Sequence, residues 1–456
     1  MAHAQWGVTV RSLDSGETLY ERNGAKLMMP ASNMKIVTLA GVVGLVGWDE
    51  EFETELENTG SVAGGVLRGD LIVRGSGDPT INTRNGRGAA VFAEWIAALR
   101  AAGISEISGR VIGDDDYMDD EGIGAGWAWD YLQYGYAAPV GALQYNENVA
   151  ELTVMPGAAV GEPAVVRLAT GSGYTLVNRT MTSAADLPET IDYRRQLDRA
   201  TLEVFGTVPL ASPVATVAAA RTVTRQVAVV NPTVFFVQSL REALMAAGIR
   251  VTGDAVDIDD LAPADRAGLV ITGRLFESQS PPLREIATVM MKVSQNLYAE
   301  TLLKWAGMPV KAGTVQAGRD VVRDTLREWK IDDRALVMSD GSGLSRYNYV
   351  SANLLTDILA HMWADPKHRE PFMGTMPVAG KDGTLTTRMR RSRAEGNAMA
   401  KTGSISNVRS LSGYVRTRDG EMLTFSILAN DFVIPAAAVN WIADLAVEVL
   451  ANFTRQ

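Results

Sequence analysis

The stretch that decides the fold is Pro30-Ala31-Ser32-Asn33-Met34-Lys35, followed by the apolar run Ile36-Val37-Thr38-Leu39-Ala40. Its pattern is typical of a loop that enters a helix. Residues three apart share a helix face, so the hydroxyl of Ser32 and the amine of Lys35 can meet. A lysine whose pKa is lowered by burial or by nearby positive charge can take the serine's proton and activate it as a nucleophile. The alternative is a surface helix that begins with a capping serine, so the assignment depends on other motifs.

The composition limits the classes of function. The chain has 456 residues, a net charge of -10, three histidines and no cysteine. The acidic balance argues against an extended nucleic-acid interface and against a cationic membrane-binding surface. Without cysteine there are no disulfides, thiolate metal sites or cysteine nucleophiles, and the histidines show no zinc-binding spacing. We therefore expect no metal and no cofactor.

The sequence shows no segment that would cross a membrane. It has no run of about 18 or more apolar residues. Its first residues have neither the basic region nor the apolar region of a signal peptide. We expect either that the protein is not exported or that a signal peptide has been removed.

Two further motifs follow the first in chain order. They are Ser294-Gln295-Asn296, before a helical pattern, and Lys401-Thr402-Gly403-Ser404, within a strand-like segment. Two similar stretches have simpler explanations. Ser351-Ala352-Asn353 is typical of a helix N-cap, and Lys381-Asp382-Gly383 of a glycine turn.

Ser-x-x-Lys, Ser-x-Asn and Lys-Thr-Gly, in this order, form the signature of serine β-lactamases and penicillin-binding proteins. The first two motifs are far enough apart to enclose a domain or two. This layout resembles that of the class C low-molecular-mass penicillin-binding proteins, the D-alanyl-D-alanine carboxypeptidase/endopeptidase family. In that family two extra domains interrupt the transpeptidase-like domain between its first and second motifs.

The similarity covers essentially the whole chain and is weakest in its β-rich middle. The further matching stretches are Gly69-Asp70-Leu71, Gly75-Ser76-Gly77-Asp78-Pro79-Thr80, Asp340-Gly341-Ser342-Gly343-Leu344-Ser345, Gly380-Lys381-Asp382-Gly383-Thr384-Leu385 and Ser412-Gly413-Tyr414.

The resemblance implies an α+β fold. We expect a penicilloyl-serine-transferase (β-lactamase/transpeptidase-like) domain, an antiparallel sheet with flanking helices, at residues 1–60 and 273–456. An inserted α/β domain is expected at 61–149 and 224–272, and a nested all-β domain at 150–223. The stretch Ala98-Leu99-Arg100-Ala101-Ala102-Gly103-Ile104 recurs as Ala243-Leu244-Met245-Ala246-Ala247-Gly248-Ile249. This repeat indicates two similar helix–strand units in one module.

Chemistry and the resemblance together suggest a role for each motif residue. Ser32 is expected to attack the carbonyl of the penultimate D-alanine and form an acyl-enzyme, with Lys35 as the base. Ser294 is expected to relay a proton between Lys35, Lys401 and the leaving amine. Lys401 adds positive charge that lowers the pKa of Lys35 and attracts the terminal carboxylate of the substrate.

The same two motifs are expected to bind the substrate. Asn296 would hold the substrate amide, and Thr402 and Ser404 would donate hydrogen bonds to its terminal carboxylate. Gly403 would let the substrate backbone approach the strand. The backbone N–H groups of Ser32 and Ser404 are the expected oxyanion hole.

An aromatic stretch has two interpretations. It is Gly126-Trp127-Ala128-Trp129-Asp130-Tyr131-Leu132-Gln133-Tyr134-Gly135-Tyr136. Such a density of aromatic residues can form a hydrophobic mini-core or a recognition surface. The resemblance implies that this stretch approaches the active site and holds the side-chain amine and methylenes of the substrate. The residues expected to bind substrate are Trp129, Asp130, Tyr134 and Tyr136.

The remaining patterns indicate structure rather than chemistry. The stretch from Gly75 to Thr80 lacks the third glycine of a dinucleotide loop, so we expect a turn. The acidic run 114–121 lacks EF-hand spacing and is expected to be a solvated loop, with weak calcium binding as the alternative. The apolar helix expected at 435–452 lacks a basic polar face, so it is expected to cover a sheet, with at most peripheral membrane contact.

The sequence therefore predicts a serine D-Ala-D-Ala carboxypeptidase that also cleaves peptidoglycan cross-links as an endopeptidase, in the periplasm or outside the cell. Its expected partners are peptidoglycan stem peptides, with β-lactam antibiotics as inhibitors and no nucleic acid. One alternative is a β-lactamase or related serine esterase, which is disfavoured because no deacylation base is evident. The other is a catalytically silent cell-wall-binding protein, against which the intact set of three motifs argues.

Overall fold

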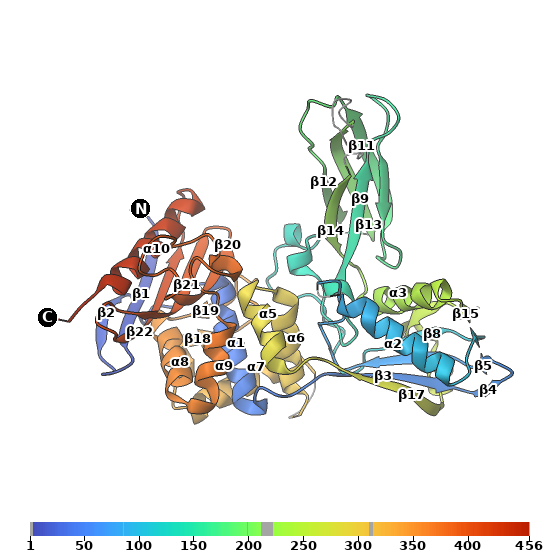
Figure 1. Ribbon diagram of the computed structural model, residues 1–456, viewed down its shortest axis with the longest axis horizontal. Coiled ribbons are helices and arrows are strands. Elements are labelled where there is room, and N and C mark those ends of the chain that lie inside the picture. Colours follow the sequence, from blue (N-terminus) through green and yellow to red (C-terminus); the bar gives the residue numbers. More distant parts are fainter. Residues whose placement is uncertain (1–2, 85, 198, 211–221, 310–312, 456) are drawn as a thin grey trace. The chain divides into compact units, whose positions relative to one another are not determined.

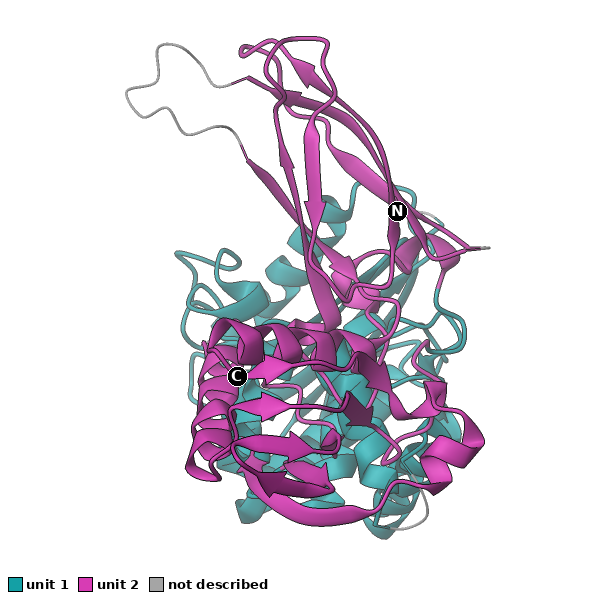
Figure 2. Cartoon of the chain, turned by 90° about the vertical axis from the view of Figure 1, so that its right-hand side faces the viewer, with its two compact units in different colours: residues 1–51, 124–127, 281–456 teal, residues 52–123, 128–280 magenta. Residues whose placement is uncertain are grey.

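The computed structural model describes residues 3–84, 86–197, 199–210, 222–309 and 313–455. The chain forms two compact units (Figure 2). Unit 1 consists of residues 1–51, 124–127 and 281–456, and unit 2 of residues 52–123 and 128–280. The three-domain division expected from the sequence placed residues 52–60 and 273–280 with the catalytic domain, whereas they lie in unit 2, and residues 124–127 lie in unit 1. The further division of unit 2 into two domains stays a prediction. Residues 198 and 211–221 of its all-β part lie outside the described residues.

Unit 1 is built on a five-stranded antiparallel sheet in the order β2-β1-β22-β21-β20 (Figure 1). The strands are β1 (Gln5–Ser12), β2 (Thr18–Arg22), β20 (Met399–Ile405), β21 (Val408–Arg416) and β22 (Met422–Asn430). Alternate residues of a strand face opposite sides of a sheet. Leu423, Phe425 and Ile427 of β22 accordingly share a core with Ala443 and Val447 of helix α10 (Ala436–Asn452). The expectation that this C-terminal helix covers a sheet is confirmed.

Helices cover the other face of this sheet as well. The hydroxyl of Tyr414 in β21 donates a hydrogen bond of 2.8 Å to the carbonyl of Leu359 in α8 (Ala352–Ala364). Helix α1 (Met34–Val46) is buried on all sides from Met34 to Val43, and it packs against α6, α7 and α8. The other helices and short elements are η1 (Ala31–Asn33), α5 (Leu283–Lys292), α6 (Asn296–Gly307), α7 (Val315–Glu328), η6 (Asp333–Ala335), β18 (Leu336–Val337), β19 (Tyr349–Val350), α9 (Pro366–Thr375) and η7 (Gly383–Leu385). The predicted antiparallel sheet with flanking helices is confirmed.

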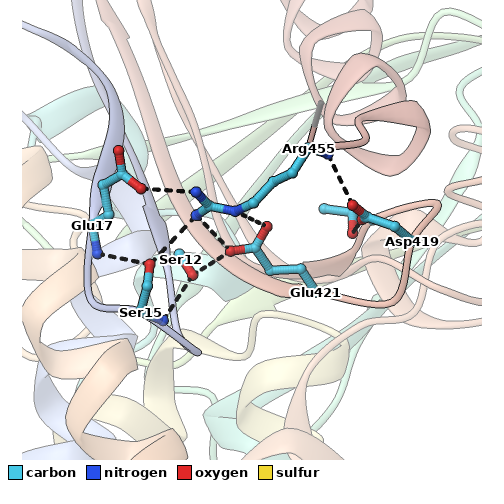
Figure 3. A network of polar contacts seen from close by, with 7 residues as sticks. Ser12, Ser15, Glu17, Asp419, Glu421 and Arg455 are labelled. Carbon is cyan, nitrogen blue, oxygen red and sulfur yellow. Dashed lines mark hydrogen bonds and ion pairs between the residues drawn. The ribbon is translucent and has the colours of Figure 1, made fainter.

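Arg455 fastens the turns at one end of this sheet (Figure 3). Its guanidinium pairs with Glu421 and with Glu17, each at 2.9 Å, and its backbone N–H donates to Asp419. Glu421 also accepts a hydrogen bond of 2.5 Å from Ser12. The hydrogen bond from Arg455 lowers the pKa of the Glu421 carboxyl. The turn between β1 and β2 and the turn before β22 are thus held by the segment that follows α10.

Unit 2 contains an α/β part with two sheets, in the orders β16-β8-β6-β3-β17 and β15-β7-β5-β4. The repeated sequence ends its two long helices, α2 (Arg87–Ala101) and α3 (Pro232–Ala246), and Leu99 and Leu244 enter one core. The strands after each helix lie side by side in parallel, β7 with β15 and β8 with β16. The two similar helix–strand units expected from the repeat are therefore confirmed. The remaining bounds are β3 (Glu53–Thr59), β4 (Ser61–Ala63), β5 (Val66–Arg68), β6 (Leu71–Gly75), β7 (Glu106–Ile107), β8 (Val111–Asp114), β15 (Arg250–Val251), β16 (Ala255–Asp257), η5 (Ile258–Asp260), α4 (Pro263–Ala267) and β17 (Ile271–Gln279).

The rest of unit 2 is rich in strands. Two three-stranded sheets, β10-β9-β14 and β11-β13-β12, share a core that includes Leu152 of β9 and Leu202 of β13. The strands are β9 (Val149–Met155), β10 (Val165–Leu168), β11 (Thr175–Ser183), β12 (Asp192–Gln196), β13 (Thr201–Pro209) and β14 (Val223–Ala228). Three short 3-10 helices precede them: η2 (Trp129–Tyr131), η3 (Gly135–Ala137) and η4 (Asn146–Asn148).

Candidate active site

Ser32 lies in the 3-10 turn η1, directly before α1. The helix itself begins at Met34, two residues later than the Ser-x-x-Lys pattern alone suggests. Ala31 adopts the left-handed conformation (φ 46°), which a residue with a side chain rarely takes. No side chain caps either η1 or α1, and α1 is buried. The alternative of a capping serine on a surface helix is therefore wrong.

Lys35 makes three polar contacts through Nζ. They join it to Ser32 Oγ at 3.1 Å, Asn296 Oδ1 at 2.6 Å and the carbonyl oxygen of Ser342 at 2.8 Å. A neutral amine has two N–H donors and one lone pair. It can therefore donate to Asn296 and Ser342 while accepting the proton of Ser32. This set of contacts suits proton transfer from Ser32 to Lys35.

Burial changes the acidity of both motif lysines. Desolvation lowers the pKa of Lys35 from 10.5 to about 7, against the opposing charges of Glu300 and Asp340. Lys401 is fully buried too, and desolvation followed by the nearby charge of Lys35 lowers its pKa well below the usual value. At neutral pH a large fraction of Lys35 is therefore unprotonated and able to act as a base.

The second motif meets the third. Nζ of Lys401 donates to Ser294 Oγ at 2.8 Å and to the carbonyl of Thr402 at 2.9 Å. Ser294 adopts a left-handed backbone (φ 62°) in the turn between α5 and α6. Such a conformation persists only where the surroundings hold it. An ion pair of 2.7 Å between Lys292 and Asp382 fastens the start of this turn.

Strand β20 runs close to the backbone of the nucleophile. A Cβ added at Gly403 would lie 2.7 Å from the carbonyl oxygen of Pro30 and 2.9 Å from the backbone nitrogen of Ser32. The side chain of Asn33 donates to the carbonyl of Lys401 at 2.9 Å. Gly403 is thus required for the contact between β20 and the nucleophile turn. This is a second reason for a glycine at this position, besides the expected approach of the substrate backbone.

Thr402 and Ser404 of the third motif lie on β20, the edge strand of its sheet. Thr402 is half-buried and its hydroxyl donates to Thr384 Oγ1 at 2.8 Å, while Ser404 is exposed. Lys381, Asp382 and Gly383 form the expected turn rather than a second Lys-Thr-Gly site, because η7 begins at Gly383. Ser351 caps α8 by accepting a 3.0 Å hydrogen bond from the Leu354 N–H, as expected.

Sequence reasoning missed two buried carboxylates behind Lys35. Glu300 is 2% exposed and accepts hydrogen bonds from the backbone N–H groups of Gly341 (2.9 Å) and Ser342 (2.8 Å). Asp340 is fully buried and accepts from the N–H of Gly343 at 2.8 Å. Desolvation raises the pKa of Glu300, and the charge of Asp340 adds to the increase. Glu300 follows Asn296 by one helical turn, and this spacing is the signal that could have revealed it.

The sequence placed Trp127 in the aromatic stretch but assigned it no role in this site. It is buried, and its Nε1–H donates to Asp340 Oδ2 at 2.9 Å. Two residues earlier, the carbonyl of Ala125 accepts hydrogen bonds from Ser339 Oγ and Ser345 Oγ. Residues 124–127 therefore belong to unit 1 and help to hold the loop that contains Asp340 and Ser342.

The predicted recognition residues belong to unit 2 and divide into two groups. Trp129 is 67% exposed and Asp130 is exposed as well. Tyr134 stacks on Tyr136 with 5.5 Å between ring centroids, and it contacts Tyr193 of β12 at 5.6 Å. The mini-core interpretation therefore fits Tyr134, whereas Trp129 and Asp130 are at the surface and Tyr136, although stacked on Tyr134, is 45% exposed.

The sequence suggested that the acidic run 114–121 is a solvated loop. The structure shows that the run is not uniformly solvated. A carboxylate oxygen of Asp115 lies within 4.8 Å of those of Asp257 and Asp259. Desolvation raises the pKa of Asp115 to about 7, and Thr233 donates to it at 2.5 Å. Asp116 remains exposed. Because β8 and β16 are parallel neighbours, they bring the first acids of the run beside those that follow β16.

The fold and the motifs together define a class. A sheet of five antiparallel strands with flanking helices presents Ser-x-x-Lys, Ser-x-Asn and Lys-Thr-Gly in one polar cluster. This is the penicilloyl-serine-transferase fold, here with extra domains. The model of the D-Ala-D-Ala carboxypeptidase 3 (S13) family matches residues 1–452. The chain belongs to this family of serine-type D-Ala-D-Ala carboxypeptidases, as the motif resemblance implied.

One relative supports this assignment, and two solved structures share the fold. A D-alanyl-D-alanine carboxypeptidase of Actinomadura sp. (strain R39) is 36% identical over 445 residues, which cover 94% of this chain and 78% of the relative. The crystal structure of penicillin binding protein 4 from Haemophilus influenzae superposes with a TM-score of 0.82 at 23% identity, covering 99% of this chain and 98% of that one. A predatory peptidoglycan endopeptidase from Bdellovibrio bacteriovorus shares the fold at a TM-score of 0.51 and 18% identity, with 99% and 95% coverage.

Proposed function

We propose that the protein removes the terminal D-alanine of peptidoglycan stem peptides through an acyl-enzyme on Ser32, and that it also cleaves peptide cross-links as an endopeptidase. The observation that carries the proposal is the 3.1 Å contact between Ser32 Oγ and Nζ of Lys35, a buried lysine whose pKa is lowered to about 7. In a cross-linked substrate, the amine of a neighbouring stem peptide takes the place of D-alanine as the leaving group.

Acylation begins with attack of Ser32 Oγ on the carbonyl carbon of the penultimate D-alanine, while its proton passes to Lys35. The backbone N–H groups of Ser32 and Ser404 would bind the oxyanion. The C–N bond then breaks, and the leaving amine takes a proton relayed by Ser294, which is hydrogen-bonded to Lys401. Free D-alanine leaves, and an ester of Ser32 remains.

Water then cleaves this ester, releasing the shortened peptide and restoring Ser32. Throughout both steps, Asn296 would hold the substrate amide. Lys401, Thr402 and Ser404 would bind the terminal carboxylate, and Gly403 would let the substrate backbone lie along β20. In support of this, β20 is the edge strand of its sheet, and the isolated bridge from Val378 on its outer side is at Met399, before the Lys-Thr-Gly motif.

β-Lactams mimic the acylating step, and a β-lactam complex is known for penicillin binding protein 4 from Haemophilus influenzae. We expect penicillin to form one lasting adduct, on Ser32, which intact mass spectrometry will detect. Ser32→Ala should form none. Ser351→Ala, which loses only a helix cap worth about 1 kcal/mol of stability, should still be acylated.

Other outcomes of this experiment would change the assignment. An adduct on Ser32→Ala would refute the choice of nucleophile. Rapid turnover of the wild-type adduct would indicate a β-lactamase, and a wild-type protein without any adduct would indicate a binding protein.

We propose that the exposed pair Trp129 and Asp130 recognises the side chain of the stem peptide together with Tyr134 and the 45% exposed Tyr136, which stack on each other. A diaminopimelate side chain offers methylenes and an ammonium, which suit an aromatic wall and a carboxylate. Asp130→Ala is therefore expected to lower kcat/KM about tenfold on peptides with a free side-chain amine. Acylation by penicillin should stay close to the wild-type rate.

The control for this prediction is Asp186→Ala, which removes an exposed carboxylate elsewhere in unit 2. It should leave both rates unchanged. Equal losses on peptide and penicillin for Asp130→Ala, together with a lower melting temperature, would favour the mini-core interpretation instead.

Peptidoglycan lies outside the cytoplasmic membrane, so we place the protein in the periplasm or outside the cell. No helix in the described part of the chain combines the length and the apolar character needed to span a bilayer. We propose at most peripheral contact with a membrane, which the acidic net charge disfavours.

A further inference from the structure

The loop behind Lys35 is held by carboxylates that the reaction itself does not use. The carbonyl of Ser342 orients Nζ of Lys35 at 2.8 Å. The N–H group of Ser342 and that of Gly341 donate to different oxygens of one carboxylate, that of Glu300. Glu300 therefore fixes the peptide groups on either side of Gly341, directly before the carbonyl of Ser342. Asn296 of the same helix contacts Lys35 directly at 2.6 Å.

This carboxylate is buried at a high energetic cost. Glu300 and Asp340 are both almost completely buried, and like charges in a site of low dielectric constant disfavour each other. A glutamine could accept a hydrogen bond at only one of its two terminal atoms. A carboxylate is therefore the group that can accept hydrogen bonds from both loop N–H groups, and its charge also acts on Lys35.

We propose that Glu300 is a positioning residue for the acylation step: its carboxylate holds the loop that orients Lys35 and, where it is ionised, stabilises the ammonium form of Lys35. This inference rests on the proposed role of Lys35 as the base. The reaction requires neutral Lys35, so the acylation rate falls as the pH drops below the pKa of Lys35. The charge of Glu300 favours the protonated form of Lys35 and so raises the pH at which the acidic limb of the rate profile falls.

The charged groups around Lys35 come from three elements. Glu300 lies on α6, Asp340 precedes Ser342 in the loop, and Lys401 lies on β20. Both carboxylates raise the pKa of Lys35, and a charged Lys401 would lower it. Lys304, one turn beyond Glu300 on α6, is also buried. Glu300 and Asp340 both combine charge with hydrogen bonds to the orienting loop, and Glu300 is the one that binds the N–H group of Ser342 itself.

The test is the pH dependence of single-turnover acylation by a fluorescent penicillin between pH 5 and 9, for wild type and Glu300→Gln. We expect the midpoint of the acidic limb to fall by about one pH unit, because the substitution removes a negative charge that stabilises protonated Lys35. The plateau at high pH should fall about tenfold, because one loop N–H loses its acceptor. Glu203→Gln is the matched control. Glu203 is a buried carboxylate in unit 2, paired with Arg179 and Arg194, and its replacement should leave the profile unchanged.

A conservative variant separates charge from position and remains informative if Glu300→Gln does not fold. Glu300→Asp keeps the charge but is one methylene shorter, so its midpoint should match wild type while its plateau falls about tenfold. An unchanged midpoint in folded Glu300→Gln, or an unchanged plateau in Glu300→Asp, would overturn the inference. A wild-type protein that is not acylated at any pH would instead refute the proposed function.

Discussion

Lys35→Ala is expected to slow acylation by penicillin about 10²–10⁴-fold, the usual effect of removing a general base. Ser32 would keep its place in the η1 turn but would lose the group 3.1 Å away that takes its proton. The residual rate should also lose its acidic limb near pH 7, because the titrating amine is gone. Stopped-flow measurement of acylation across pH, with intact mass as the end point, checks both effects.

An exposed lysine provides the control for this variant. Lys367→Ala, in the first turn of α9, should be acylated at the wild-type rate with the same pH profile. Melting curves must show that Lys35→Ala is folded at the assay temperature. If a folded Lys35→Ala protein were acylated within about threefold of wild type, well inside the effect of a general base, another group would have to be the base.

The second large effect is expected for Gly343→Ala. Gly343 has a left-handed backbone (φ 86°), and a Cβ there would overlap the carbonyl oxygen of Ala31. The methyl group must therefore push apart the nucleophile turn and the loop that orients Lys35. A displacement of about 1 Å can cost about 100-fold in rate, so we expect at least that loss in acylation. The strained backbone alone should cost about 1–2 kcal/mol of stability.

Gly374→Ala is the matched control for this substitution. Gly374 is exposed near the end of α9, and a Cβ there would meet no atom within 4 Å. Alanine favours helix over glycine by up to about 1 kcal/mol, so its stability should be equal or higher and its acylation unchanged. A Gly343→Ala protein with the melting temperature and acylation rate of wild type would mean that the two loops are not in close contact in solution.

The sequence predicted the sheet, its flanking helices and the residue types of the site because short-range patterns encode them. The apolar alternation around Phe425 and the buried run after Met34 are visible without a structure, and so is the repeat that ends α2 and α3. The three motifs identified the family because their order is specific. Their residue-by-residue roles remain predictions until the variants are measured.

What the sequence could not provide was the support around the motifs. Glu300, Asp340 and Trp127 act through contacts between distant segments, and a buried carboxylate in a helix looks like any surface acid in the sequence. The close approach of Gly403 to Ser32 likewise depends on how β20 packs against the nucleophile turn. The acidic run was misjudged in part for the same reason, since Asp257 and Asp259 reach Asp115 only through the pairing of β8 with β16.

The pairing of β1 with β22 has a consequence for how the protein folds. Ser12 stands opposite Leu423, and about 400 residues separate the two strands in the chain. At about 5–20 residues per second, their synthesis takes roughly 20–80 s, during which unit 2 can fold but the sheet of unit 1 cannot close. Ser32 is synthesised long before Lys401. An unfinished chain of this hydrolase therefore has no complete active site. During this delay the N-terminal strand has no partner. In refolding of the complete chain the same long-range pairing is expected to form slowly and to leave the strand exposed to aggregation.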